Sequence, residues 1–287
     1  MKFYPKLLLG GLVALLLISC QTTPQPKASG PIVMTPVADY RVVNGELISE
    51  NPDQPVLPEH LEIWDWIRWV YPQEWINFIG SFGLDTDGEM GGFAYVDVDR
   101  LPDGTALSTW RLVIDPADMI LDDATSESHF PRVLTHELSH IMALNESQFI
   151  LDEISDSDQD QWMNHWDFSQ GYRNVYGIAQ KNSYMNRFVQ EFWPAPQILN
   201  WPIPPMDKIN PMELGSLIAK VKDEYPDSFV STYAMMSVEE DFAESFSEYV
   251  FQEDVQGDSV MSRKIRFFGQ FDELVLAREQ IRLELGL

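Results

Sequence analysis

Cysteine is almost absent from this sequence, which has 287 residues and a single cysteine, Cys20. One cysteine allows no intrachain disulfide and no zinc site built from cysteine pairs, so a metal ion has to be held by His, Asp or Glu. Positive charge is also scarce: 19 Lys and Arg stand against 45 Asp and Glu, which gives a formal net charge of -26. Such a charge repels a phosphate backbone, and we therefore expect no nucleic-acid partner. The residues that are present, 45% hydrophobic and 12% aromatic, are sufficient for a packed core.

The start of the chain has the features of a bacterial export signal. Lys2 and Lys6 precede an apolar run, residues 7–18, that is too short to span a bilayer as a mature helix. The run ends in Leu17-Ile18-Ser19-Cys20, which resembles the bacterial lipobox, where the chain is cut before the cysteine and the cysteine is lipidated. The resemblance implies a protein of the bacterial cell envelope, attached to a membrane through lipid on Cys20. It leaves open whether the protein faces the periplasm or the cell surface.

The composition divides the chain into three parts. Residues 1–19 form the predicted signal peptide. Residues 20–39 contain four prolines and little periodic apolar character, which predicts a flexible tether. The folded domain is expected over residues 40–287, with an elaborated helical region at 145–231 that is interrupted by a proline-rich stretch.

Apolar residues at three- and four-residue steps predict helices over most of this domain. The predicted helices are residues 57–70, 75–82, 125–144, 184–192, 212–225 and 237–251, followed by helical spacing through 259–285. Two β-rich runs, 93–98 and 107–114, flank a turn that contains Pro102 and Asp103-Gly104, and they predict a hairpin. Four tryptophans are assigned to the core: Trp64, Trp66, Trp69 and Trp75.

The segment His136-Glu137-Leu138-Ser139-His140 fits the HExxH pattern and lies in the predicted helix 125–144. One helical turn separates the two histidines, so both imidazoles leave the same face and can take two adjacent positions around a tetrahedral zinc ion. Glu137 lies one step round the helix, where its carboxylate can take a proton from a water on the ion. The pattern predicts a catalytic zinc site; the alternative is a helix that carries these three residues on its surface.

A catalytic zinc ion needs a third protein ligand, and several residues compete for that place. Glu146 stands where the metzincin pattern HExxHxxGxxH has its last ligand, but Ala143 replaces the glycine that turns the chain there. A continuing helix would carry Glu146 away from the ion. His129 and His165 are also available, although neither lies in a helical frame that faces the site. The stronger candidate is Glu240, in the predicted helix 237–251.

The stretch Glu240-Asp241-Phe242-Ala243-Glu244-Ser245-Phe246 resembles the E-x-F-A-E-x-F helix of zincin metallopeptidases related to the anthrax lethal factor catalytic domain. The resemblance implies that Glu240 binds zinc, in a gluzincin-like ligand set, and that Glu244 orients a histidine ligand. It also implies a catalytic role for Tyr233, seven residues before Glu240, whose phenol would hydrogen-bond the oxyanion. The match covers only residues 136–140 and 233–246.

Two features leave alternatives at this helix. His140 and Glu240 are separated by 99 residues, more than is usual in that family. We therefore expect the intervening region to be specific to this protein's own branch of the family. Ser237 and Glu240 also fit a capping box, in which Glu240 would close the helix start on itself. Glu244 is alternatively a solvated residue, and Tyr233 a core residue.

These features predict a zinc-dependent endopeptidase that acts on a peptide or protein substrate. By the resemblance, the fold is α+β and zincin-like, mostly helical with a small β-sheet above the active-site helix. The substrate would lie along a sheet edge, for which residues 110–114 are expected. The tryptophans of the elaborated region are candidates for the wall of the cleft: Trp162, Trp166, Trp193 and Trp201. Two alternatives remain: a non-catalytic surface lipoprotein that binds a glycan or a protein, and a zinc amidase that cleaves a cell-wall crosslink.

Overall fold

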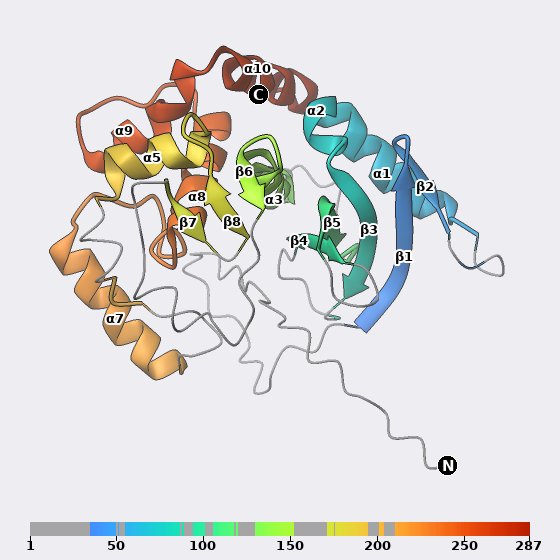
Figure 1. Ribbon diagram of the computed structural model, residues 1–287, viewed down its shortest axis with the longest axis horizontal. Helices are drawn as coiled ribbons and strands as arrows, with labels where there is room; N and C mark the ends of the chain where they lie inside the picture. Colours follow the sequence, from blue (N-terminus) through green and yellow to red (C-terminus); the bar gives the residue numbers. More distant parts are fainter. Residues whose placement is uncertain are drawn as a thin grey trace.

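The computed structural model is a mixed α and β body that contains two sheets (Figure 1). It describes residues 35–287 except 50, 52–54, 87, 89–93, 101–105, 118, 120–129, 152–170, 175, 195–200 and 204–209. The predicted signal peptide and Cys20 lie outside the described residues. Within the part that is described, no helix combines the length and the apolar character needed to cross a membrane.

Five strands form the larger sheet, in the order β2-β1-β3-β5-β4. Their bounds are β1 Thr35–Val43, β2 Glu46–Ile48, β3 Ile79–Thr86, β4 Ala94–Arg100 and β5 Ala106–Ile114. β1 and β2 are joined by Asn44 and Gly45, whose φ angles of 53° and 80° are those that a tight hairpin turn requires. β1 begins at Thr35, before the expected start of the folded domain at residue 40.

The predicted hairpin is confirmed, but the predicted sheet edge is wrong. β4 and β5 pair antiparallel, with Val96 opposite Leu112. β5 also pairs in parallel with β3, so residues 110–114 lie inside the sheet. A hairpin pattern indicates that two strands pair and does not say which of them joins the rest of the sheet. Among the described strands, β4 forms this edge.

The helix predicted over residues 75–82 is also wrong. After α1 (Pro58–Val70), the chain makes only the short helix α2 (Gln73–Ile76) and enters β3 at Ile79. Phe82 and Leu84 then alternate toward the core, with both side chains fully buried. A short apolar run is compatible with a helix and with a strand, and in this protein pairing within the sheet determines that the residues from Ile79 onward form a strand.

The tryptophans of this region are only partly where the sequence predicts them. Trp64 and Trp75 are buried, as predicted, and Trp66 is half-buried against the core. Trp69 is 57% exposed, so its assignment to the core is wrong.

The described residues that follow β5 are largely helical. They contain α3 (Phe130–Leu144), α5 (Tyr184–Phe192), α7 (Pro211–Glu224), α8 (Val238–Phe251), α9 (Val260–Phe267), the 3-10 turn η4 (Phe268–Gln270) and α10 (Asp272–Leu285). The helices predicted at 184–192, 212–225 and 237–251 are confirmed to within one residue at each end. A three-stranded sheet, ordered β6-β8-β7, comprises β6 (Phe149–Leu151), β7 (Arg173–Asn174) and β8 (Gly177–Ala179).

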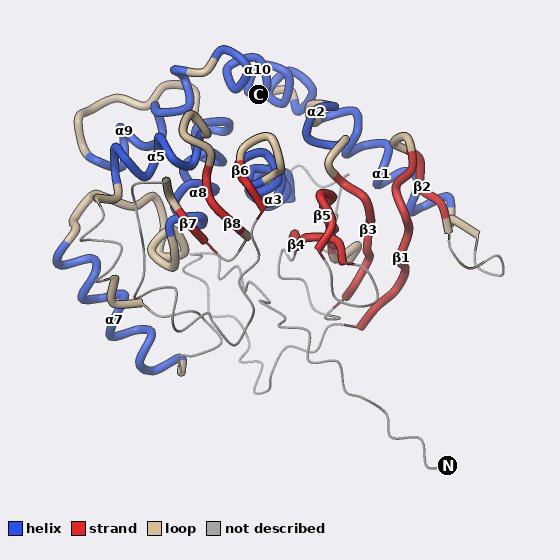
Figure 2. Tube along the Cα trace, viewed as in Figure 1, coloured by secondary structure: helices blue, strands red, loops and turns tan. Residues whose placement is uncertain are grey.

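Helix α3 lies at the centre of the molecule, between the two sheets in the view of Figure 2. It packs against α8 on one side and against β4 on another. The far side of α8 contacts α5 and α9 through a cluster of aromatic rings: Phe188, Phe242, Phe246, Phe267 and Phe268. Because α8 is held from both sides, residues on its α3 face occupy fixed positions.

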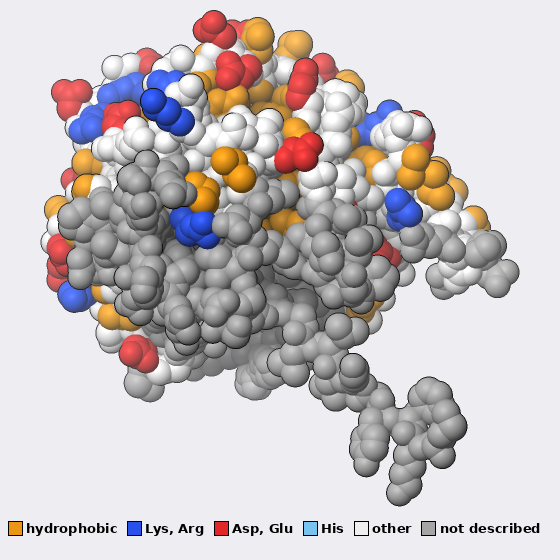
Figure 3. Space-filling view, viewed as in Figure 1, with side chains coloured by type: hydrophobic (Ala, Val, Ile, Leu, Met, Phe, Trp, Pro, Cys, Tyr) orange, Lys and Arg blue, Asp and Glu red, His pale blue; other side chains and the backbone are white. Residues whose placement is uncertain are grey.

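Acidic side chains are spread over the visible surface. On the face drawn in Figure 3, the red Asp and Glu groups of the described residues are separated by white, orange and blue groups. The net charge of -26 therefore marks no single acidic patch on this face.

Candidate metal centre

The two histidines of the HExxH segment lie on α3, as the sequence predicts. His136, Glu137 and His140 are 1%, 0% and 5% exposed, respectively. Buried polar side chains are retained where they have partners or a function, because taking them out of water costs free energy. The alternative of three incidental residues on the surface of a helix is therefore excluded.

Asn145 ends this helix and turns the chain away from the histidines. Its side-chain amide donates hydrogen bonds to the carbonyls of Ile141 and Met142, at 2.8 and 2.9 Å. The bond to Met142 satisfies a carbonyl that the helix leaves unpaired at its last turn, and the bond to Ile141 adds a second donor to a carbonyl that already accepts from the Asn145 backbone amide. Glu146, which follows, is exposed and is not part of the histidine cluster.

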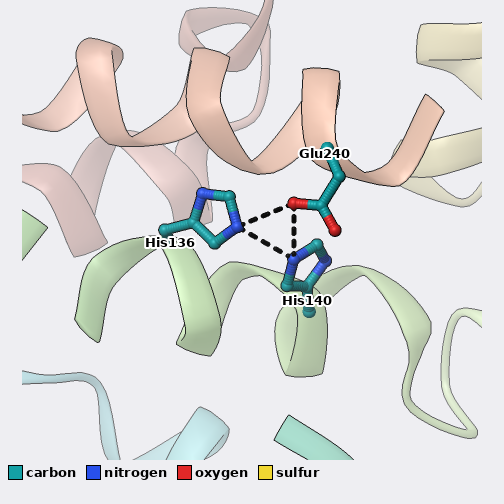
Figure 4. Close-up of side chains that lie close together, drawn as sticks. All are labelled: His136, His140 and Glu240. Atoms are coloured by element: carbon teal, nitrogen blue, oxygen red, sulfur yellow. Dashed lines mark hydrogen bonds and ion pairs between the residues drawn. The ribbon is translucent and has the colours of Figure 1, made fainter. Parts of the chain in front are cut away.

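The third member of the cluster comes from the first turn of α8. Ser237 caps this helix by accepting a hydrogen bond from the backbone amide of Glu240, at 3.2 Å. This is one half of the capping box. The carboxylate of Glu240 is engaged elsewhere, because it points at the histidines of α3 (Figure 4).

His136, His140 and Glu240 have the spacing of a metal site. The separation between the two Nε2 atoms is 3.1 Å, and Glu240 Oε2 lies 3.0 Å from His136 Nε2 and 3.6 Å from His140 Nε2. Three ligand atoms at zinc-ligand distances of about 2.0–2.1 Å in a tetrahedron stand roughly 3.3 Å apart. The observed separations bracket this value, so the three side chains fit a tetrahedral cation without rearrangement. Two imidazoles and one carboxylate are also a ligand set that zinc prefers.

The charges of the cluster favour a cation. Burial alone would raise the pKa of Glu240, but the neighbouring histidines outweigh it and lower this pKa to about 2. Burial likewise opposes protonation of His136, yet Glu240 and Glu244 raise its pKa well above the ordinary value. The carboxylates of the site thus stabilise a positive charge between them. A bound metal ion would supply this charge in place of the proton on His136.

Glu244 lies one turn after Glu240 on α8 and contacts the other nitrogen of the same histidine. Its Oε1 atom is 2.8 Å from Nδ1 of His136. A carboxylate on the far nitrogen fixes the ring orientation and leaves Nε2 free to bind a metal ion. This contact agrees with the orienting role that the sequence implies for Glu244.

Glu137 is the unusual residue of the site. No hydrogen bond of ordinary geometry from the described residues reaches either oxygen of its carboxylate, although the backbone of Val96 lies near it. Burial raises its pKa to about 7, although the nearby His136 and His140 oppose the shift. An unpaired, buried carboxylate is costly, and its pKa matches that of a group that exchanges protons near neutral pH.

Tyr233 stands beside the cluster in the segment before α8. Its ring centroid is 5.7 Å from that of His136, and its hydroxyl lies close to the Glu240 carboxylate. Burial, together with the carboxylates of Glu240 and Glu137, raises its pKa well above the ordinary value. The phenol therefore keeps its proton and is available as a donor.

The start of α8 is also held by residues that no sequence pattern singles out. Glu239, immediately before Glu240, accepts hydrogen bonds at Oε1 from the Tyr172 hydroxyl at 2.7 Å and from Asn174 Nδ2 at 3.0 Å. Tyr172 and Asn174 lie at β7, in the elaborated region. No motif or periodicity marks these two residues, because their contact with Glu239 forms only in the folded chain.

The residue after Glu240 is held from the opposite side. Asp241 Oδ2 accepts hydrogen bonds from Trp193 Nε1 at 2.7 Å and from Lys264 Nζ at 2.6 Å. Trp193 is buried, and Trp201 donates to the carbonyl of Met235 at 2.9 Å. The proposed role of Trp193 in a cleft wall is therefore wrong, because its ring is part of the core.

Several predicted residues fall outside the described part of the chain. These are Cys20, His129, His165, Trp162 and Trp166. Among the described residues, His136, His140 and Glu240 are the one group of metal-binding side chains with this mutual spacing.

Comparisons with known proteins found no match: no protein-family model, curated protein or solved structure is similar to this chain.

Proposed function

We propose that this protein is a zinc-dependent endopeptidase. The observation that supports the proposal is the combination of a buried His136, His140 and Glu240 cluster with a buried, unpaired carboxylate on Glu137. A structural zinc site fills all four positions with protein ligands and has no use for such a carboxylate. Three ligands and a free base are what hydrolysis by a metal-activated water requires.

The chain's own groups then have defined tasks. His136, His140 and Glu240 would hold a zinc ion, which as a Lewis acid would lower the pKa of a bound water to about 7 and polarise the scissile carbonyl. Glu137 would take the proton from the attacking water as a general base and pass it to the leaving amine as a general acid. Glu244 holds the His136 ring in its binding orientation through Nδ1.

Tyr233 would stabilise the negative charge that develops on the carbonyl oxygen of the substrate in the transition state. Its raised pKa keeps the phenol protonated, so the hydroxyl, which lies close to Glu240, would donate to the carbonyl oxygen of the substrate. A preformed donor of this kind stabilises the transition state more than the ground state.

The substrate is assigned to the edge strand β4. The backbone of Val96 in β4 lies near the Glu137 carboxylate, and β4 has one partner strand, β5, among the described strands. An extended peptide that pairs with the free side of β4 would pass the base with its backbone held and little demand on its side chains. This arrangement favours a peptide over a compact non-peptide amide.

The lipobox supports a place in the bacterial envelope. Lipid on Cys20 would hold the domain at a membrane through the segment that precedes β1. Mass spectrometry of the protein from membranes tests this assignment: cleavage before Cys20 and an acylated cysteine are expected, and an intact N-terminus would contradict it.

Replacing Glu137 by Gln tests the enzyme proposal. The variant should bind one zinc ion per chain and should cleave no member of a peptide library that the unchanged domain cleaves in a chelator-sensitive manner. Glu146→Gln is the matched control, because this exposed residue lies just beyond the same helix. Cleavage by the Glu137 variant at the normal rate would remove the proposed base and the mechanism with it.

A further inference from the structure

Lys264, on α9, is a buried cation outside the metal cluster. It is 1% exposed, and its Nζ atom contacts Asp241 Oδ2 at 2.6 Å and the Ser228 carbonyl at 2.8 Å. The ammonium also lies 3.9 Å from the centre of the Phe229 ring. A buried lysine is costly to desolvate, so a single ammonium that joins two separate segments needs an explanation.

The first of these segments is the start of α8. Asp241 is fully buried and follows Glu240 directly. One of its oxygens accepts from Lys264 and Trp193, while the other has no hydrogen-bond partner among the described residues. The ammonium is therefore one of the two groups that hold the Asp241 carboxylate, together with Trp193.

The second segment is the irregular stretch of residues 228–236, which carries Tyr233 and contains neither helix nor strand. Its backbone is held by contacts to other elements rather than by a regular ladder. Lys264 binds its first carbonyl, and Trp201 binds the carbonyl of Met235 near its end. Ser231 contacts Glu244 of α8.

We propose that Lys264 is a positioning residue that fixes the segment carrying Tyr233 relative to the metal-binding turn of α8. Its ammonium bridges the Ser228 carbonyl and the carboxylate next to Glu240, so it sets the distance between the phenol and the metal cluster. The inference rests on the proposed function. It adds a residue that neither touches substrate nor binds metal.

The test uses Lys264→Met, which keeps the length of the side chain and removes its charge. With zinc bound, amide hydrogen exchange in residues 228–236 should become about tenfold faster or more, while exchange in α3 stays unchanged. The kcat for a cleaved peptide should fall about 100-fold with little change in KM. In a Tyr233→Phe background, the same substitution should cost less than about threefold, because the phenol it positions is gone.

Arg278→Met is the matched control. Arg278 is on α10 and donates to the carbonyls of Tyr249 and Gln252 at the opposite end of α8, at 2.6 Å each. This variant loses partly buried hydrogen bonds at the C-terminal end of the same helix and should leave exchange in residues 228–236 and kcat unchanged. Equal effects of the two substitutions on both measurements would overturn the inference.

A second variant covers the case in which Lys264→Met does not fold. Asp241→Leu combined with Lys264→Met replaces the buried ion pair by apolar groups, a change that is often neutral for stability. The double variant should melt near the normal temperature and still show the fast exchange and the low kcat. If the exchange rate and kcat both returned to normal in the double variant, Lys264 would have a structural role alone and the inference would fail. If the unchanged protein cleaves no peptide, the proposed function fails, and the exchange result alone decides the inference.

Discussion

The hydrogen bond between Glu244 and His136 should contribute a measurable part of the zinc affinity. Replacing Glu244 by Ala removes the carboxylate that lies 2.8 Å from Nδ1 of His136. A hydrogen bond to a charged group contributes about 1.5–3 kcal/mol, and each 1.4 kcal/mol corresponds to roughly tenfold in an equilibrium constant. The zinc dissociation constant should therefore rise about 10- to 100-fold, the range expected for a carboxylate behind a metal-binding histidine. Because the Glu244 side chain is 20% exposed, we expect the lower part of this range.

Competition with a chromophoric chelator at constant pH measures this change. Glu248→Ala is the matched control, since Glu248 lies one turn later on α8 and pairs with Arg132 at 2.8 Å instead of with a histidine. The control variant should bind zinc as tightly as the unchanged protein. The reasoning is refuted if the Glu244 and Glu248 variants have the same zinc affinity, because His136 would then need no carboxylate to orient it.

Three further predictions concern the same centre. Glu240→Ala should abolish stoichiometric zinc binding in metal analysis, because only two imidazoles of the cluster remain. Glu146→Ala should retain one ion per chain, and the reverse result would identify Glu146 as the third ligand. Tyr233→Phe should lower kcat by about 10²- to 10³-fold at unchanged zinc content, and a normal rate would return this residue to a packing role. Zinc binding should release a proton, because Glu240 and Glu244 raise the pKa of His136 in the metal-free protein. The apparent affinity should then rise by about tenfold per pH unit up to that pKa, and calorimetry in two buffers of different ionisation enthalpy should detect the proton; a heat independent of the buffer would argue against it.

The metal cluster could be predicted because its parts are encoded in short segments. His136 and His140 need only a helix to share a face, and the prediction of α3 provided it. Glu240 and Glu244 follow the same rule on α8, and the sequence alone placed both at one helical turn from each other. The meeting of the two helices came from a resemblance, and the structure brings Glu240 to the histidines.

The remaining errors come from information that is not local. The identity of the edge strand depends on β3, which pairs directly with β5 although β4 lies between them in the sequence. The first four residues of β3 were themselves predicted as the end of a helix. The contacts of Glu239 and Lys264 join segments 65 and 36 residues apart in the sequence. Nothing in the pattern of either segment indicates such a partner, because only tertiary packing creates it.

The interface between α3 and α8 has a consequence for how the protein acquires its stability. It encloses the carboxylates of Glu137, Glu240 and Glu244 around the imidazoles of His136 and His140, all buried or nearly so. An ion that binds there and not to the unfolded chain stabilises the native state by about 2.7 kcal/mol when its free concentration is 100 times the dissociation constant. With the export and the zinc site proposed above, the protein would gain part of its resistance to unfolding from the divalent ions of its surroundings, and a strong chelator would act on it as a denaturant as well as an inhibitor of the proposed activity.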